Sequence, residues 1–217
     1  MPVRRIGLCY RSVSGRVPMG DGRRPVAVES TLERDFALLQ RFDPKVATIE
    51  EQSVRVEYRT TGGSRRFYVP DFLVTLRRPG LSTKLVEVKF STDPALLSGA
   101  LDERFAAARA FASARDWSFE VVTEKRIRTP QLGNATFLLP YRQRPVDASI
   151  RARLLMALRS GPATVEELAD VAGGDRGRTL PTLWGMVARF EIGANLDRPL
   201  TMRSQLYLPE NDHGRAV

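Results

Sequence analysis

Hydrophobic residues recur with a helical period in two stretches of the N-terminal half of the chain. In residues 30–42, STLERDFALLQRF, the side chains of Leu32, Phe36 and Leu39 are three or four positions apart and share one face of an amphipathic helix. An Asp-Pro pair follows and ends that helix. The same spacing returns in residues 94–115, where a proline near the start fits a first helical turn.

Three runs between these helices alternate apolar and polar residues with the period of a β-strand. They are VATIEEQSVRVEY (46–58), RRFYVPDFLVTLRR (65–78) and KLVEVKF (84–90), and the turn segments TTGGS and PGLST separate them. A fourth run, SFEVVTEKRI (118–127), follows the second helix. The order helix, three strands, helix, strand predicts an α/β domain with a mixed sheet that ends near residue 140.

The C-terminal third of the chain has a helical pattern with a short strand pattern at its end. We expect helices within residues 149–161, 164–173 and 179–191, and two short strands around a polar tip in residues 198–210. Three helices followed by a hairpin are typical of a winged helix, whose third helix is the candidate recognition helix. The predicted organisation is a basic N-terminal arm (1–28), an α/β domain (29–140), a linker (141–148) and a winged-helix-like domain with a polar tail (149–217).

A small group of charged residues interrupts two of the apolar runs. Side chains alternate between the faces of a strand, so Glu87 and Lys89 project together from one face of the run at 84–90, while the other face has the pattern of a core. Asp71 comes directly after Pro70, in the preceding run. We expect the two runs to pair and to bring Asp71 alongside Glu87 and Lys89 in a compact, one-sided site.

These three side chains have the chemistry of a metal-dependent hydrolytic site. The carboxylates of Asp71 and Glu87 are hard oxygen ligands of the kind that Mg²⁺ or Mn²⁺ prefers, often with a backbone carbonyl and waters completing the shell. Lys89 can hold or help to deprotonate a water, or neutralise charge on a phosphate. Such a site needs neither histidine nor cysteine, and the chain has one of each, His213 and Cys9.

Composition narrows the expected compartment and partners. A single cysteine excludes an internal disulfide and suits a reducing cytoplasm, and no apolar run approaches the ~20 residues of a membrane span or forms a signal peptide at the N-terminus. With 34 Lys+Arg against 25 Asp+Glu, the net charge of +9 predicts a nucleic acid as the first partner, although an ordinary arginine-rich surface is the alternative. The candidate DNA contacts are Arg65, Arg66, Arg176, Arg178, Arg189 and Arg203.

The ordered motifs resemble those of a known nuclease family. Pro70-Asp71 followed by Glu87-Val88-Lys89 is similar to the PD-(D/E)XK nuclease pattern, and the expected element order is that of its core. More specifically, the chain resembles the TnsA-type transposon endonucleases, which have S-x-x-E on a helix, then E-Q, Y-x-P-D-F and E-V-K. These motifs correspond here to Ser30–Glu33, Glu51-Gln52, Tyr68–Phe72 and Glu87–Lys89. The resemblance implies a restriction-endonuclease-like mixed sheet flanked by helices, followed by a winged-helix domain.

The resemblance also implies an activity and a set of site residues. Asp71 and Glu87 would bind Mg²⁺, with Mn²⁺ as a substitute, and the backbone carbonyl of Val88 would complete the ligands. Lys89 would act on the water or the phosphate. Glu33 would complete the acidic cluster, and Gln52 would support it. The enzyme would hydrolyse the 5′, non-transferred strands at transposon ends in double-stranded DNA, beside a TnsB-like DDE transposase and a TnsC-like ATPase.

Simpler interpretations of the same residues stay open at this point. Ser30 and Glu33 match a helix capping box, Asp71 can accept a turn hydrogen bond, and Glu87 with Lys89 can form a solvated ion pair on a half-exposed sheet. The winged helix can bind a protein as readily as DNA. The alternative functions are therefore a restriction or repair nuclease that acts alone, and a non-catalytic winged-helix DNA-binding protein with a degenerate nuclease core.

Overall fold

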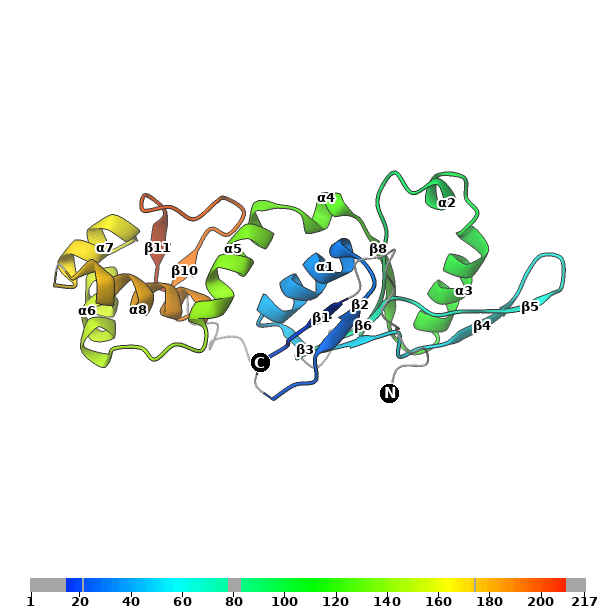
Figure 1. The fold of residues 1–217 in the computed structure, drawn as a ribbon, viewed down its shortest axis with the longest axis horizontal. Coiled ribbons are helices and arrows are strands. Elements are labelled where there is room, and N and C mark those ends of the chain that lie inside the picture. The colour runs from blue at the N-terminus through cyan, green and yellow to red at the C-terminus, as the bar shows by residue number, and fades with distance from the viewer. Residues whose placement is uncertain (1–14, 21, 78–82, 174, 210–217) are drawn as a thin grey trace, which may run out of the picture. The chain divides into compact units, whose positions relative to one another are not determined.

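The structure, a computed structural model, describes residues 15–20, 22–77, 83–173 and 175–209. The chain divides into two compact units, of which the first ends at Arg128 and the second begins at Thr129 (Figure 1). Residues 1–14 of the predicted basic arm lie outside the described residues. The two units are described separately.

A four-stranded mixed sheet forms the centre of the first unit. Its strand order is β3-β6-β7-β8, with the outer pair β7–β8 parallel and the other pairs antiparallel. The parallel pair requires a crossover, which the two helices between β7 and β8 supply. This arrangement confirms the predicted α/β class with a mixed sheet. The strands are β3 (Val46–Glu51), β6 (Phe72–Leu76), β7 (Lys84–Val88) and β8 (Ser118–Val122), and the crossover helices are α2 (Pro94–Leu97) and α3 (Asp102–Ser113).

Helices cover both faces of this sheet. Helix α1 (Thr31–Phe42) packs on one face, where the rings of Phe36 and Phe72 stack with centroids 5.2 Å apart. On the other face, α3 packs through Phe105, whose ring centroid is 5.4 Å from that of Phe119 in β8. All of β7 from Leu85 to Val88 is therefore buried, and the half-exposed sheet of the simpler interpretation is absent at this strand.

Residues 15–17 and 26–28 form two paired β-strands, where the sequence predicted part of a basic arm. β1 (Gly15–Val17) and β2 (Val26–Val28) pair antiparallel, and Val17, Val26 and Val28 are 2–3 % exposed in the same core as α1. Each strand is only three residues long. A strand of that length shows too few alternations for a sequence pattern to reveal it.

Two of the three predicted consecutive strands break in the middle. The first run divides into β3 and β4 (Val56–Arg59), and the second divides into β5 (Arg65–Tyr68) and β6. β4 and β5 pair only with each other, as a separate two-stranded ribbon. The breaks have local causes. Gln52 adopts a left-handed backbone with φ 43°, and Pro70 lacks the N–H that a ladder needs.

Other elements also end earlier than predicted. The helix expected over 94–115 divides into α2 and α3 around Gly99, whose φ of 74° is left-handed and suits glycine. The fourth strand ends at Val122, and residues predicted to continue it form a short helix, α4 (Glu124–Ile127).

The second unit contains helices and a small antiparallel sheet of order β10-β11-β9. Its first two elements occupy residues predicted to end the α/β domain, so the unit begins before the expected linker. β11 pairs with β9 and β10, whereas the sequence predicted a hairpin confined to 198–210. A winged-helix domain stays a prediction. The elements are α5 (Pro130–Leu138), η1 (Leu139–Tyr141), α6 (Ala148–Arg159), β9 (Ala163–Thr164), α7 (Val165–Val171), α8 (Arg176–Ala188), β10 (Gly193–Ala194) and β11 (Gln205–Tyr207).

Among the described residues, none of the helices has the length and apolar character needed to cross a membrane.

Candidate active site

Asp71 lies at the start of β6, between the end of β3 and strand β7. Its backbone carbonyl accepts the N–H of Gln52 at 2.9 Å, and its Oδ2 accepts the N–H of Val88 at 2.7 Å. The carboxylate is therefore fixed against the neighbouring strand, as the pairing of the two runs predicts. The backbone hydrogen bond from Val88 also favours the ionised form of the acid.

Glu87 is a buried carboxylate with two partners. The residue is 3 % exposed, its Oε2 accepts the hydroxyl of Tyr68 at 2.5 Å, and its Oε1 lies 3.0 Å from Nζ of Lys89. This ion pair between buried Glu87 and Lys89 differs from the solvated surface ion pair that was one interpretation of the sequence. Burial first, and then the charge of Glu87, raise the pKa of Tyr68, so this phenol keeps its proton and acts as a hydrogen-bond donor.

Tyr68 is a site residue that sequence reasoning missed. Its ring packs between Phe105 and Phe119, with centroids 6.1 and 6.4 Å away. The available signal was its position in Y-x-P-D-F, three residues before Asp71. A tyrosine in a strand usually indicates core packing, so the sequence alone gave no reason to expect its hydroxyl at Glu87.

Lys89 follows β7 and is held as a cation. Its backbone N–H donates to the carbonyl of Val122, and its ammonium faces Glu87. Burial lowers the pKa of this lysine, but the charges of Glu87 and Asp71 raise it by more, and the net shift is upward. A lysine in this state supplies positive charge and donors, whereas proton abstraction would need a lowered pKa.

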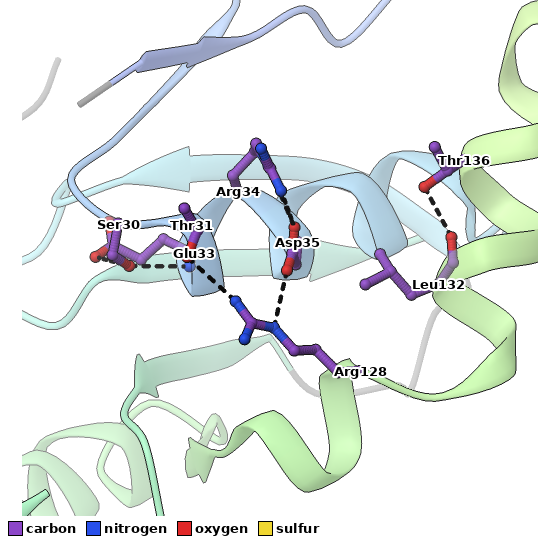
Figure 2. A network of polar contacts seen from close by, with 8 residues as sticks. All are labelled: Ser30, Thr31, Glu33, Arg34, Asp35, Arg128, Leu132 and Thr136. Atoms are coloured by element: carbon purple, nitrogen blue, oxygen red, sulfur yellow. Dashed lines mark hydrogen bonds and ion pairs between the residues drawn. The ribbon is translucent and has the colours of Figure 1, made fainter. Parts of the chain in front are cut away.

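Glu33 serves the start of α1 and also adds to the acidic group. Its carboxylate accepts the backbone N–H of Glu29 at 2.8 Å and the hydroxyl of Ser30 at 2.9 Å, while Ser30 Oγ accepts the N–H of Glu33 (Figure 2). This is close to the predicted capping box, except that the carboxylate reaches the backbone of Glu29 and not that of Ser30. Burial raises the pKa of Glu33, and its hydrogen bonds with Glu29 and Ser30 lower it.

The acids in this group repel one another. Burial raises the pKa of Asp71 well above its usual range, and the charges of Glu87 and Glu33 raise it further. Lys89 and the N–H of Val88 oppose this shift without cancelling it. Ionisation of Asp71 is therefore unfavourable in the folded protein, and a divalent cation at this position would favour its ionised form.

The donor set fits a hard divalent cation but is not a complete cage. Among the described residues, no group of three or more histidine, cysteine, aspartate or glutamate side chains is gathered closely enough to hold a metal ion. Asp71 and Glu87 are two oxygen donors on adjoining strands. Mg²⁺ commonly uses one or two carboxylates and keeps several waters, so two such donors are compatible with its chemistry.

Gln52 lies beside Asp71 and has an unusual backbone conformation and an unsatisfied side chain. The residue is 5 % exposed, its φ is 43°, and within the described chain its Oε1 has no hydrogen-bond partner. A buried carbonyl without a partner costs about 1–3 kcal/mol, and a left-handed backbone on a non-glycine residue adds strain. Both costs fall at one position, whose backbone N–H donates to the carbonyl of Asp71 in the acidic group.

Comparison with known families decides the class of this domain. Residues 43–124 match the family described as TnsA-like endonuclease N terminal. The chain carries a TnsA-like endonuclease domain. The match runs from the end of α1 to the start of α4, so it contains Asp71, Glu87 and Lys89, while Glu33 and the second unit lie outside it. No curated protein matches the chain significantly. The family indicates a nuclease subunit of a transposase that acts on DNA.

A second polar network connects α1 to the end of the first unit. Asp35 is buried, and its carboxylate contacts Arg34 at 2.8 Å and Arg128 at 3.1 Å (Figure 2). Arg128 also donates to the hydroxyl of Thr31 at 3.1 Å. The sequence gave no signal for this contact, because Asp35 and Arg128 are far apart along the chain. The network holds the helix that carries Glu33 against the end of the first unit.

The arginines predicted to contact DNA fall into two groups. Arg65 and Arg66 are exposed on β5, and neither pairs with a carboxylate among the described residues. In the second unit, Arg176 contacts Asp170 at 2.9 Å. Likewise Arg178 contacts Asp147 at 2.6 Å, and Arg189 contacts Glu191 at 3.0 Å. Arg203 is exposed near β11.

Helix α8, the candidate recognition helix, is mostly buried. All residues from Thr182 to Ala188 are buried, so about half of the helix cannot present side chains to a ligand without unfolding. Its exposed part is the first turn, where Arg176 and Arg178 lie. A role for this helix in DNA contact stays a prediction.

Proposed function

We propose that the protein is a divalent-metal-dependent DNA endonuclease, the TnsA-like subunit of a heteromeric transposase, which cuts the 5′ strands at transposon ends. One observation carries the proposal. Asp71, Glu87 and Lys89 meet at adjoining strands within the segment that matches the TnsA-like endonuclease family. By family resemblance, the partners are a TnsB-like DDE transposase and a TnsC-like ATPase.

Each residue has a role that follows from its contacts. Asp71 and Glu87 would hold Mg²⁺ or Mn²⁺, with the Val88 carbonyl and Glu33 as further candidate ligands. When bound, the ion would supply Lewis-acid stabilisation of phosphate charge and lower the pKa of a water. The ammonium of Lys89 would stabilise the negative charge that develops on the phosphate.

Tyr68 and Gln52 would act through their neighbours. The hydroxyl of Tyr68 fixes one oxygen of Glu87, which limits the orientations that this carboxylate can take. The backbone of Gln52 holds that of Asp71, and its unused Oε1 is available to a water or an ion. These are positioning roles, because neither residue is placed against a reacting atom.

The experiment that tests the proposal is a metal titration of the full chain by calorimetry. Mg²⁺ and Mn²⁺ are titrated into the wild type, into Asp71→Ala/Glu87→Ala and into Glu50→Ala/Glu57→Ala. The control pair is exposed on β3 and β4, so it removes the same charge away from the site. We expect saturable binding in the wild type and the control, and its loss in the site variant. Equal binding by all three proteins would contradict the proposal.

Cleavage then separates the proposed function from its alternatives. We expect the wild type to nick supercoiled plasmid in Mn²⁺ only when a cognate transposase is present, and the site variant to be inactive. Efficient nicking by the purified chain alone would favour a restriction or repair nuclease. Binding of DNA with neither metal binding nor cleavage under any condition would favour the non-catalytic alternative.

A further inference from the structure

The β4–β5 ribbon has one inner and one outer face. Cross-strand partners share a face, and the register pairs Val56 with Tyr68, Glu57 with Phe67, Tyr58 with Arg66, and Arg59 with Arg65. The first and third pairs lie on the inner face, and the second and fourth lie on the outer face. In Figure 1 the two strands run together beside α3, apart from the central sheet.

The inner face anchors the ribbon to the nuclease domain. Val56 and Tyr68 are buried against Leu101, Phe105 and Ala108 of the α3 segment. At the other end, the turn is tied to the same helix, because the backbone N–H and the hydroxyl of Thr61 both donate to Glu103. The ribbon is therefore held at its base and at its tip, and its outer face is preorganised.

The outer face presents positive charge and one apolar ring to solvent. Phe67 is 58 % exposed, and the guanidinium of Arg55 lies over its ring, 4.2 Å from the centroid. Arg55 also pairs with Glu57 at 3.4 Å. Arg59 and Arg65 are exposed directly opposite each other. A hollow of about 500 Å³ lies along the ribbon, and residues of both faces line it: Arg55, Glu57, Tyr58, Arg59, Arg65, Arg66 and Phe67.

The opposition of Arg59 and Arg65 is unfavourable in the isolated protein. Like charges directly opposite on a pair of strands destabilise the pairing. Within the described part of the chain, neither guanidinium contacts a carboxylate, and Arg59 donates only to the carbonyl of Gly63 at 3.3 Å. An anion placed between them would remove this repulsion, and guanidinium groups bind phosphate through paired hydrogen bonds.

The ribbon leads directly into the candidate active site. β5 ends at Tyr68, whose hydroxyl contacts Glu87, and Asp71 follows three residues later. From Arg65 to Asp71 the chain spans at most roughly 20 Å when fully extended. A duplex that reaches the acidic group therefore passes within reach of the outer face of the ribbon.

We propose that the outer face of the β4–β5 ribbon binds the phosphate backbone of duplex DNA beside the cleavage point, with Arg59 and Arg65 as the paired phosphate contacts. The inference rests on the proposed nuclease function. It replaces the sequence-adjacent pair Arg65 and Arg66 with a cross-strand pair, because Arg66 belongs to the inner face. Backbone contact predicts binding that is independent of sequence and steeply dependent on salt.

The test is the affinity of the full chain for labelled DNA, measured by fluorescence anisotropy over a series of salt concentrations. Chelator is present throughout, so metal and cleavage play no part. Arg59→Ala/Arg65→Ala is compared with the wild type, with Arg59→Lys/Arg65→Lys, and with Lys45→Ala/Lys125→Ala. The last pair removes two exposed positive charges from the same unit, away from the ribbon. Two short duplexes of unrelated sequence are used.

We expect the ribbon alanine pair to lose roughly tenfold or more in affinity, and its slope of log K against log salt to fall by about 1.8, which corresponds to two phosphate contacts. The lysine pair should keep most of the affinity, and the control pair should change by less than about twofold. Loss on both duplexes supports backbone contact. Unchanged affinity and slope would overturn the inference, and the exposed arginines would then favour an acidic protein as the partner of this face.

Failure of this inference is distinct from failure of the nuclease function. The anisotropy series measures DNA binding in the absence of metal. The calorimetric titration of the Asp71→Ala/Glu87→Ala variant measures metal binding in the absence of DNA. The melting temperatures of the ribbon variants, measured by circular dichroism, should equal or slightly exceed that of the wild type, because both arginines are exposed and the alanine pair removes their repulsion. If the alanine pair has a lowered melting temperature, the affinity is measured instead with Arg59→Gln/Arg65→Gln. This variant keeps long polar side chains and removes both charges. Lost affinity in the glutamine pair would then support the inference, and unchanged affinity would overturn it.

Discussion

The β4–β5 ribbon and the region around α8 both contain arginines that are candidate DNA contacts by composition, but the two regions differ in whether these arginines form ion pairs with acids. On the ribbon, Arg59 and Arg65 lie opposite each other, and neither contacts a carboxylate among the described residues. Arg176, Arg178 and Arg189 around α8 each contact an acid of their own unit. An arginine that is already paired gives up that contact when it binds a phosphate, so the net gain is smaller. A count of arginines therefore indicates a nucleic-acid partner but does not identify the surface that binds it.

Buried amides differ between the two units in the same way. Asn134 in the second unit donates to the carbonyls of Leu196 and Arg198 at 2.9 and 2.8 Å, and accepts the N–H of Leu200 at 3.0 Å. Gln52 in the nuclease unit has a buried oxygen without such a partner among the described residues. The satisfied amide holds a loop in place, and the unsatisfied one lies beside the acidic group. Of these two buried amides, only that of Gln52 therefore has an oxygen available to a further partner.

Among the substitutions considered in the two units, Asp71→Asn is expected to have the largest effect, which is on DNA cleavage. The amide oxygen can still accept the N–H of Val88, but the buried negative charge and a metal ligand are lost. We expect cleavage to fall on the order of 1000-fold, as for loss of a group essential to the chemical step. Nicking of plasmid in the presence of the transposase measures this, with Glu50→Gln as the exposed control. Cleavage within about tenfold of the wild type would show that Asp71 is not a metal ligand.

The same variant should be more stable than the wild type without metal. Because the pKa of Asp71 is raised in the folded state, the native protein binds a proton more tightly than the unfolded chain does. Stability from this group is therefore present at low pH and is lost as pH rises through the raised pKa. In chelator, the Asp71→Asn variant should melt above the wild type at neutral pH, and the two melting temperatures should converge in acid. A lower melting temperature at neutral pH would contradict this sign.

The contrast between the two amides predicts a large loss of stability for one leucine substitution and a small change for the other. Asn134→Leu leaves two carbonyls and one N–H without partners, so we expect the free energy of unfolding to fall by about 3 kcal/mol. Gln52→Leu removes an oxygen that has no partner within the described chain, so we expect a change below about 1 kcal/mol. Chemical denaturation of both variants measures the difference. Equal losses would mean that Gln52 is as structural as Asn134.

A smaller effect is expected from Tyr68→Phe. The ring packing against Phe105 and Phe119 is kept, and only the hydrogen bond to Glu87 is lost. A hydrogen bond to a charged group contributes about 1.5–3 kcal/mol, so cleavage should fall by roughly tenfold to 100-fold. Mn²⁺ affinity, measured by calorimetry, should fall with it. The control is Tyr58→Phe, on the same face of the ribbon, which should leave both unchanged.

The sequence predicted the proximity of Asp71, Glu87 and Lys89 better than it predicted the elements around them. The alternation in KLVEVKF and the Pro70-Asp71 step are local, and strand geometry converts them into a shared position for Asp71, Glu87 and Lys89. The family match supports the same segment. The hydroxyl of Tyr68 at Glu87 needed knowledge of which ring turns inward, and that depends on α3, which is distant in sequence.

The fold departed from the predictions where a single residue decided the backbone or where distant partners decided the packing. Gln52 and Gly99 each interrupt a periodic run through a left-handed φ, and periodicity does not detect such a point. The unit boundary at Arg128 and the burial of α8 depend on long-range packing. The ion pair between Arg178 and Asp147 joins residues that are distant in the sequence. A list of DNA contacts based on composition therefore could not take it into account.

The smallest expected effect is that of Arg178→Ala on DNA affinity. Arg178 is exposed, but its guanidinium contacts Asp147, whose carboxylate also caps α6 by accepting the N–H groups of Ser149 and Ile150. DNA contact by Arg178 would have to replace that ion pair, so we expect a loss of less than about twofold, well below that of the ribbon pair. The same anisotropy series measures it. Asp147→Asn sharpens the test, because an asparagine keeps the cap and removes the charge that holds Arg178. If the second unit binds DNA, this substitution should raise the affinity, and Arg178→Ala in the same background should cancel the gain. A loss for Arg178→Ala as large as that of the ribbon pair would reverse the comparison and assign the main DNA surface to the second unit.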